Sequence, residues 1–431
     1  MVICKIEELV KPRMLVATTT WWPLSARIAL AFLQSGCEVD GIAPRGNPME
    51  RVTALNRQFL YKAINPLGAL RNALKQSMPD LIIPCDDRVV THLHQLFHAE
   101  ALRDIESPIA KLIVRSLGDP SGYPVTSNRA RLLQLAKWQG VRVPETLIVH
   151  QPSDIGSWRS GRTFPLVIKA DGTWAGNGVK VAHNLKESEQ AFRRLQKRLT
   201  PVAAIWHMSE HNFYPIFENC AGSKPEIIAQ TYIKGTSANA MFACWHGKVV
   251  GSVTVRVIAA KHELGASTIV RTMHHPKISA AAVLIVKELN ISGFCGLDFI
   301  IQEGTGTPFL IELNPRATQL GHLKVGQSAD LAACLCKALL GETFASAPDP
   351  SAEETIAFFP QIPLEQFKKL QSSYGDLIHD IPREDAELTE ELMNVSWTER
   401  QWSARLCSSA RLQALKIIKA ICRRHTAASS G

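Results

Sequence analysis

Several features that would classify a protein at a glance are missing from this chain of 431 residues. No stretch approaches the run of about 18 apolar residues that a membrane-spanning helix needs. The first residues, MVICKIEELVKPR, carry acids where a secretion signal has an apolar core. The ten cysteines include no C-x-x-C pair, which argues against a zinc site and against a disulfide scaffold. The sequence therefore predicts a cytoplasmic protein with reduced, mostly buried thiols.

The common catalytic and nucleotide-binding signatures are also missing. There is no G-x-S-x-G motif, and nothing identifies a serine or cysteine nucleophile. The turn after the first expected strand, TTTWWPLSAR, lacks the G-x-G-x-x-G of a dinucleotide site, and no G-x-x-x-x-G-K-[ST] P-loop occurs.

An even distribution of positive charge along the chain is also missing. The net charge is +9, but it is concentrated in one segment. Residues 400–431 hold seven Lys or Arg and no acid, whereas residues 376–399 hold eight acids and one base. This distribution does not predict nucleic-acid binding. The basic segment has the apolar stripe of an amphipathic helix, which either packs against the protein's own body or contacts a membrane surface or a partner.

The pattern along the chain predicts a multidomain protein with α/β and α+β parts. Residues 13–20, 24–39 and 79–87 read as strand, helix–strand and strand, which predicts a doubly wound N-terminal α/β domain over residues 1–117. A segment rich in Gly, Pro and Ser follows, and strands then dominate an α+β domain over residues 118–345. Residues 346–431 form a small C-terminal region with the acidic segment and the basic helix.

The most informative fragment is GFCGLDFIIQEGTGTPFLIELNPR, residues 293–316. Its two apolar strands flank a Gly- and Pro-containing turn, which predicts a β-hairpin with Asp298 directly opposite Glu312. Like charges opposed in this way are destabilising unless something neutralises them. Asn314 adds an amide oxygen on the same face, so the set suits Mg²⁺, or Mn²⁺. The alternative is an exposed hairpin with solvated acids, and a register slip of one residue would turn Asp298 to the other face.

Two further fragments are compatible with a nucleotide but do not require one. In FPLVIKADGTWAGNGVKVAHN, a strand ends at Lys169 and a loop carries Gly172, Gly176 and Gly178. Such a loop can wrap a phosphate, although glycine-rich hairpins also occur for steric reasons. In EIIAQTYIKGTSANA, a strand leads through Gln230 to Ile233, where backbone groups could read an adenine edge; an ordinary meander fits equally well.

Taken in order, these pieces resemble the ATP-grasp superfamily, in particular its carbamoyl-phosphate-synthetase-like and biotin-carboxylase-like branch. The resemblance covers about residues 13–340 and is carried most specifically by Asp298 and E-x-N-x-R at 312–316. It implies an ATP-grasp fold with an N-terminal pre-ATP-grasp domain, and it implies ATP and Mg²⁺ as ligands. Asp298, Glu312 and Asn314 would hold the metal, and Arg316 would face the reacting phosphoryl group. The implied ATP contacts are Arg129, Lys169, Gly172, Gly176, Gly178, Gln230, Tyr232 and Ile233.

The sequence departs from the family pattern at two places. Arg129 stands where members often have Lys, and its planar fork differs from a point charge. Gln230, Thr231 and Asn239 stand where members often carry Glu for the adenine amine or the ribose.

The reaction implied by the resemblance is activation of a carboxylate to an acyl phosphate, followed by attack of an amine to form an amide. Lys169 and Arg316 would be the catalytic cations, and Arg256 and Arg271 are candidates to hold the carboxylate substrate, unless they are surface arginines of strands. Two alternatives remain open: a bicarbonate-activating enzyme, although no Met-Lys-Met biotin-carrier signature occurs, and a non-catalytic nucleotide-binding protein. The expected partners are small-molecule substrates, with a homodimer and a peripheral contact of the basic helix as further expectations.

Overall fold

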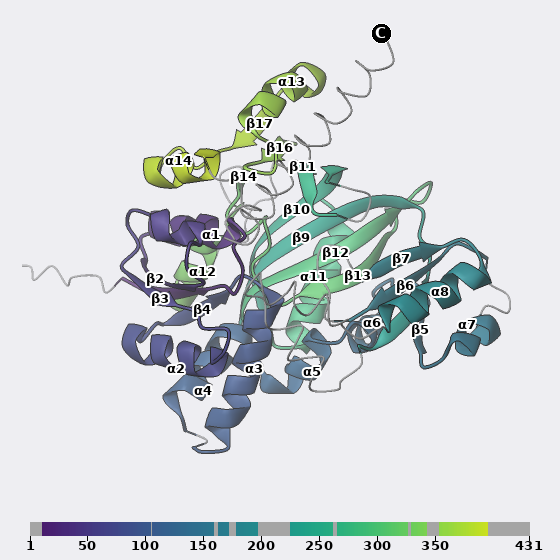
Figure 1. The fold of residues 1–431 in the computed structure, drawn as a ribbon, viewed down its shortest axis with the longest axis horizontal. Coiled ribbons are helices and arrows are strands. Elements are labelled where there is room, and N and C mark those ends of the chain that lie inside the picture. The colour runs from purple at the N-terminus through teal and green to yellow at the C-terminus, as the bar shows by residue number, and fades with distance from the viewer. Residues whose placement is uncertain are drawn as a thin grey trace, which may run out of the picture.

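The computed structural model describes residues 11–104, 106–158, 163–171, 178–196, 225–261, 265–325, 329–342 and 353–394. Figure 1 shows three groups of elements: an N-terminal sheet with its helices, a large twisted sheet in the centre, and a smaller sheet at the opposite end from the N-terminal one. The mixed α/β fold class predicted from the sequence is confirmed.

The N-terminal sheet is parallel and has the strand order β3-β2-β1-β4. Its inner strand β1 has the mostly apolar sequence RMLVA, and four consecutive residues are buried, as expected for a strand covered on both faces. The following helices begin at capping side chains: Asn65 for α2 and Asp86 for α3. The elements are β1 (Arg13–Ala17), α1 (Leu24–Gln34), β2 (Glu38–Ala43), η1 (Pro48–Arg51), β3 (Arg57–Leu60), α2 (Pro66–Ser77), β4 (Leu81–Pro84), α3 (Asp87–Ala101) and α4 (Pro108–Leu117).

The smaller sheet has the order β5-β8-β6-β7, and all its pairings are antiparallel. Its apolar side packs on α7 and α8 through a cluster that includes Ile168 and Phe192. The elements of this part and its approach are η2 (Pro120–Gly122), α5 (Tyr123–Thr126), α6 (Arg129–Trp138), β5 (Thr146–Val149), α7 (Pro152–Trp158), β6 (Leu166–Ala170), β7 (Val179–Ala182), α8 (Leu185–Leu195) and β8 (Ile227–Thr231).

The large sheet has seven strands in the order β13-β12-β9-β10-β11-β16-β17. All pairings are antiparallel except β16 with β17. Residues 355–380, placed by the sequence in a C-terminal region, thus extend this sheet. The elements are β9 (Gly235–Trp245), β10 (Lys248–Ala260), β11 (Ser267–Thr272), α11 (Pro276–Glu288), β12 (Gly293–Gln302), β13 (Pro308–Asn314), β14 (Lys324–Val325), β15 (Ala329–Asp330), α12 (Leu331–Leu339), β16 (Thr355–Phe358), α13 (Leu364–Tyr374), β17 (Leu377–Asp380) and α14 (Ala386–Asn394).

One continuous apolar cluster joins the N-terminal sheet to the large sheet. It contains Met14 and Val16 of β1, Met241 of β9, and Leu335 of α12, all with no exposed surface. A second cluster, on the other face of the large sheet, packs β9 and β12 against α11 and α6. The large sheet therefore has two buried faces, and the face toward the N-terminal elements carries the candidate site.

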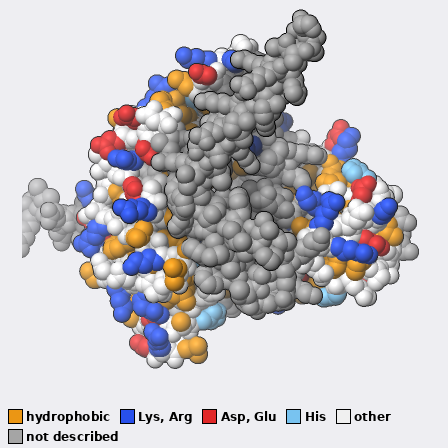
Figure 2. All heavy atoms as spheres, viewed as in Figure 1, with side chains coloured by type: hydrophobic (Ala, Val, Ile, Leu, Met, Phe, Trp, Pro, Cys, Tyr) orange, Lys and Arg blue, Asp and Glu red, His pale blue; other side chains and the backbone are white. Residues whose placement is uncertain are grey.

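The surface of the described residues carries mixed charge. Figure 2 shows Lys and Arg side chains next to acidic and uncharged ones over both ends of the molecule. Within the ranges that the structure describes, no helix is both long and apolar enough to cross a membrane. The basic segment 400–431 lies outside the described residues.

Candidate active site

The site is built on a row of three polar residues that crosses three adjacent strands. β12 pairs with β13 so that Asp298 faces Glu312, and Gly296 faces Asn314. On its other side β12 pairs with β9, which sets Asp298 opposite Asn239. The predicted pairing of Asp298 with Glu312 is therefore confirmed, and both carboxylates lie on the same face of the sheet, although the ladder shifts register between Asp298 and Phe299 on the side of the turn.

Asp298 lies between two amides that occupy both of its oxygens. Asn239 Nδ2 donates to Asp298 Oδ1 at 2.6 Å, and Asn314 Nδ2 donates to Asp298 Oδ2 at 3.1 Å. Burial, and then the negative charge of Glu312, raise the pKa of Asp298 to about 6. Asn239 was associated with the nucleotide by the resemblance, but in the structure it supports this carboxylate.

Arg316 is fixed by a residue of the N-terminal part that the sequence did not single out. Its Nε and Nη2 donate to the two carboxylate oxygens of Asp87 at 2.7 and 2.9 Å, and Nη2 also donates to Asn314 Oδ1 at 3.0 Å. Asp87 is the first residue of α3, three positions after the end of β4. Such a bidentate pair fixes the orientation of a guanidinium plane. The signal in the sequence was the pair of acids in PCDD at the end of an apolar strand.

Arg129 contacts Glu312, one of the candidate metal residues, directly. It begins α6, whose first turn is capped by the Asn128 side chain. Its Nη2 donates to Glu312 Oε1 at 2.5 Å, and its Nη1 donates to Asp171 Oδ1 at 3.0 Å. The guanidinium therefore offsets the charge of Glu312, which is one reason why the opposed carboxylates are tolerated. Asp171, directly after β6, was not singled out by the sequence.

Lys169 is a buried cation at the end of β6, with a 7% exposed surface. Burial, and then the positive charge of Arg129, lower the pKa of Lys169 to about 8, while Glu312, Asp298 and Asp171 act in the opposite direction. Lys169 thus lies in the field of the same carboxylates. Of the three predicted loop glycines, Gly178 is described and buried at the start of β7, whereas Gly172 and Gly176 lie outside the described residues.

The segment from Gln230 to Ile233, predicted to contact adenine, has one buried residue and two more accessible ones among those named. Gln230 is buried in β8, and its Nε2 donates to Thr146 Oγ1 at 3.1 Å. Tyr232 is exposed and Ile233 is half-buried in the segment that joins β8 to β9. Their contact with a nucleotide stays a prediction.

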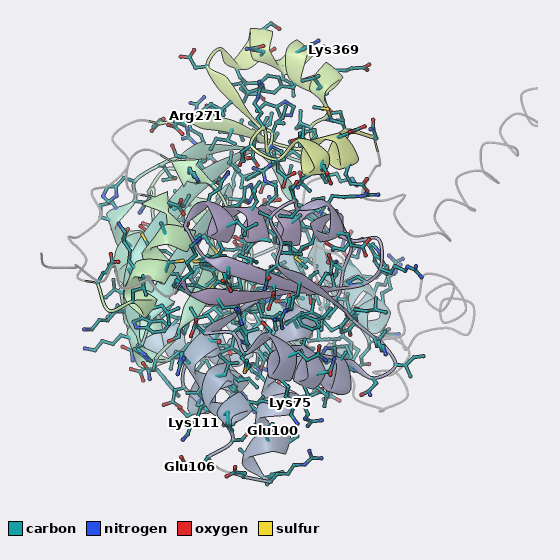
Figure 3. The ribbon with its side chains drawn as sticks, turned by 90° about the vertical axis from the view of Figure 1, so that its left-hand side faces the viewer. Lys75, Glu100, Glu106, Lys111, Arg271 and Lys369 are labelled. Carbon is teal, nitrogen blue, oxygen red and sulfur yellow. The ribbon has the colours of Figure 1, made fainter. Side chains whose placement is uncertain are left out.

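The structure does not bring Arg256 and Arg271 to this site. They face each other across β10 and β11, and Arg256 also pairs with Ala238 of β9. Ala238 precedes Asn239, so its side chain points to the opposite face of the sheet from the carboxylates. Arg271 Nε donates to Thr355 Oγ1 at 2.9 Å, and Figure 3 shows Arg271 near the C-terminal elements at the upper edge. The expected contact with a carboxylate substrate beside the metal residues is therefore not supported.

The residues at the site fit a magnesium ion. Asp298 and Glu312 supply carboxylates on one face, and Asn314 supplies an amide, so hard oxygen ligands are concentrated at one point. The pKa of Asp298 is raised by burial and then by the negative charge of Glu312, and a cation at this point would offset both effects. Asn314 currently directs its oxygen to Arg316, so ligation by that oxygen requires the amide to turn. Among the described residues, no cluster of three or more His, Cys, Asp or Glu offers a competing metal site.

The chain is similar in sequence and in fold to several known proteins. Residues 208–319 match the family model described as an ATP-grasp domain. The arginine-specific large chain of carbamoyl phosphate synthase from Geobacillus stearothermophilus is 24% identical over 295 residues, which cover 65% of this chain. The chain spans only 26% of that relative's length.

Two solved structures illustrate the similarity in fold. The biotin carboxylase domain of 2-oxoglutarate carboxylase from Hydrogenobacter thermophilus, in complex with MgADP, ADP and bicarbonate, has a TM-score of 0.55 at 14% identity, covering 80% of this chain and 73% of its own. The L-amino acid ligase from Bacillus licheniformis has a TM-score of 0.54 at 15% identity, covering 80% of this chain and 79% of its own.

These findings define the class: the protein has the ATP-grasp fold with an N-terminal α/β domain, and the predicted resemblance to the ATP-grasp superfamily is confirmed. Within that fold, the similar structures include both a carboxylase domain and an amino acid ligase.

Proposed function

We propose that the protein is an ATP- and Mg²⁺-dependent ligase that joins a carboxylate to an amine through an acyl phosphate. The observation that carries the proposal is the opposed pair Asp298 and Glu312, surrounded by the cations Arg129, Lys169 and Arg316. Two acids placed face to face on a sheet are destabilising without a cation; the ion pair of Arg129 with Glu312 offsets part of this cost, and a metal ion held by both acids would offset more.

Each residue has a distinct task in this proposal. Asp298, Glu312 and Asn314 would hold Mg²⁺, whose chemistry is to neutralise phosphate oxygens during transfer. Lys169 and Arg129 offset the charge of the triphosphate. Arg316, oriented by Asp87, faces the phosphoryl group that is being transferred.

The reaction needs no side-chain nucleophile. An oxygen of the substrate carboxylate attacks the γ-phosphorus of ATP, the bond to the bridging oxygen breaks, and ADP leaves. The nitrogen of the amine then attacks the acyl carbon, phosphate leaves, and the nitrogen loses a proton as the amide forms. The acceleration of the reaction then comes from positioning of the reactants and neutralisation of charge, in agreement with the absence of a nucleophile motif.

The test is a screen for ADP release with pools of carboxylates and amines, with and without Mg²⁺, followed by mass spectrometry of the products. The proposal predicts ADP, phosphate and an amide only when ATP, Mg²⁺, a carboxylate and an amine are all present. A folded protein that binds ATP but releases no ADP with any pool would favour the non-catalytic alternative.

A bicarbonate-activating enzyme is the second candidate, because the fold is similar to that of a carboxylase domain in complex with bicarbonate. It uses the same nucleotide residues but takes bicarbonate in place of an organic carboxylate. Bicarbonate-dependent ADP release and incorporation of labelled carbon would select this candidate, and their absence alongside amide formation would exclude it.

A further inference from the structure

Two cysteines from distant parts of the sequence meet inside the cluster that joins the N-terminal sheet to the large sheet. The Sγ atoms of Cys37 and Cys336 lie 2.6 Å apart, although the residues are 299 positions apart in the chain. Cys37 immediately precedes β2, and Cys336 lies within α12. Both are free thiols in the structure.

The surroundings of the two sulfurs are apolar and nearly closed. Cys37 and Cys336 have exposed surfaces of 5% and 4%, and both belong to the apolar cluster that contains Met14, Met241 and Leu335. Thiols make only weak hydrogen bonds, so polar pairing alone gives these two little reason to meet. A bond between them would need the sulfurs to come to about 2.05 Å, a short further approach.

The same helix provides an internal comparison. Cys334 precedes Cys336 by two positions and is half-buried, and it packs toward Gly251 of β10. Residues two positions apart on a helix point in different directions. Cys334 is therefore the more accessible thiol, and Cys336 is the one in contact with Cys37.

We propose that Cys37 and Cys336 form a disulfide when the protein meets a small oxidant such as hydrogen peroxide. One thiol attacks an oxygen of the peroxide, the O–O bond breaks, and a sulfenic acid and water result. The second thiol then attacks that sulfur, the S–OH bond breaks, and a second water leaves. Two thiols lose two electrons and two hydrogens, and one peroxide is reduced to two waters.

The environment predicts that this reaction is slow. Contact with Cys37, and then burial, raise the pKa of Cys336, so little thiolate is present at neutral pH. The bond, once formed, holds β2 of the N-terminal sheet to α12 of the large sheet. It is thus a modification site that would fix the two sheets to each other.

The experiment is a disulfide map of the full chain after prolonged treatment with hydrogen peroxide and alkylation of the remaining thiols. One tryptic peptide contains Cys37 alone, and another contains both Cys334 and Cys336. We expect these two peptides to be linked through Cys336 in the unmutated protein and in Cys334→Ser. No link is expected in Cys336→Ser. If that variant does not fold, fragmentation of the linked peptide from the unmutated protein identifies the sulfur involved.

A second readout is the thermal unfolding midpoint before and after oxidation. Closing so long a loop should raise the midpoint by about 5 °C, reversibly with dithiothreitol. A link through Cys334, or Cys37 and Cys336 that both remain alkylatable after prolonged peroxide treatment, would overturn the proposal.

Discussion

At the scale of single residues, the site is a set of mutually dependent charges. Glu312 lies against Asp298 on one side and against Arg129 on the other, and Arg129 also contacts Asp171. Each ionised carboxylate raises the electrostatic energy of its ionised neighbour, and each nearby cation lowers that energy. Burial, and then the charge of Glu312, raise the pKa of Asp298, whereas burial, and then the charge of Arg129, lower the pKa of Lys169.

These shifts predict a bell-shaped pH dependence of kcat/KM for ATP. In the proposed function, metal binding needs ionised Asp298, so activity should fall as the pH decreases through about 6. Phosphate binding needs protonated Lys169, so activity should also fall as the pH rises through about 8. Steady-state kinetics over this range measures both limbs.

The control for the alkaline limb is Lys169→Arg, because arginine stays protonated in this range. If the variant retains activity, its alkaline limb should disappear while its acid limb stays in place. An unchanged alkaline limb would assign that limb to another group.

Asp87 is expected to act by positioning Arg316. Asp87→Asn keeps the shape of the side chain but removes the charge from the bidentate pair. We expect kcat to fall about 10- to 100-fold with little change in the KM for ATP, because a small misplacement of a charged group is costly during transfer.

Glu106→Gln is the matched control for Asp87→Asn. Glu106 forms an exposed ion pair with Lys111 at the far end of the N-terminal helices (Figure 3). The kinetics of Glu106→Gln should therefore be those of the unmutated protein. Equal effects of both changes would contradict a specific role of Asp87.

At the scale of elements, the hairpin of β12 and β13 could be predicted because its information is local. The turn EGTGTP and the alternation of the flanking strands predict the hairpin, and the structure has Asp298 opposite Glu312 as expected, but a register shift between Asp298 and Phe299, which the sequence pattern did not reveal, separates this pair from the turn. The contacts of Arg316 with Asp87, and of Arg129 with Glu312, could not be predicted in this way. They join residues 229 and 183 positions apart, and no local pattern encodes such distances.

The positions of Arg256 and Arg271 relative to the site could not be predicted for a related reason. Both residues lie on regular strands, but which face of a strand points to the site depends on how β9 pairs with β10. That pairing contains a register shift between Val249 and Gly251, which a period of two read from the sequence does not reveal.

A glycine at the start of β9 is expected to control the contact between β9 and β12. A Cβ at Gly235 would lie 2.0 Å from the backbone oxygen of Ile301, so Gly235→Ala must push the two strands apart. We expect a loss of about 1–3 kcal/mol in the free energy of unfolding. Denaturant unfolding measures it, and the adjacent exposed Thr236→Ala is the control, expected to change stability by less than about 0.5 kcal/mol.

At the scale of the whole molecule, ion pairs connect the first helix to the last strand of the large sheet. Arg27 of α1 donates to Asp380 of β17 at 2.6 Å, and His322 contacts the other oxygen of Asp380 at 2.8 Å. Asp380 is nearly buried, and burial alone would raise its pKa. His322 and Arg27 outweigh this effect, so the pKa of Asp380 is lowered. The domain division predicted from the sequence places these residues in separate regions, and the folded chain brings them into contact.

Removal of Arg27 should destabilise the protein strongly. Arg27→Met keeps much of the side-chain volume but leaves the buried Asp380 carboxylate without its main cation, so we expect a loss of about 3–5 kcal/mol. Arg51→Met is the matched control, because Arg51 and Glu391 connect the same two regions through an exposed pair at 3.8 Å. Its effect should stay below about 1 kcal/mol by denaturant unfolding.

The central claim is that Asp298 and Glu312 hold the magnesium that accompanies ATP, and calorimetric titration of a non-hydrolysable ATP analogue with and without Mg²⁺ tests it most directly. For the unmutated protein, and for Glu303→Gln on the exposed turn of the same hairpin, Mg²⁺ should strengthen binding at least about tenfold. For Glu312→Gln, with the fold intact, that gain should disappear. A Glu312→Gln protein that keeps the full Mg²⁺-dependent gain in affinity would contradict the account.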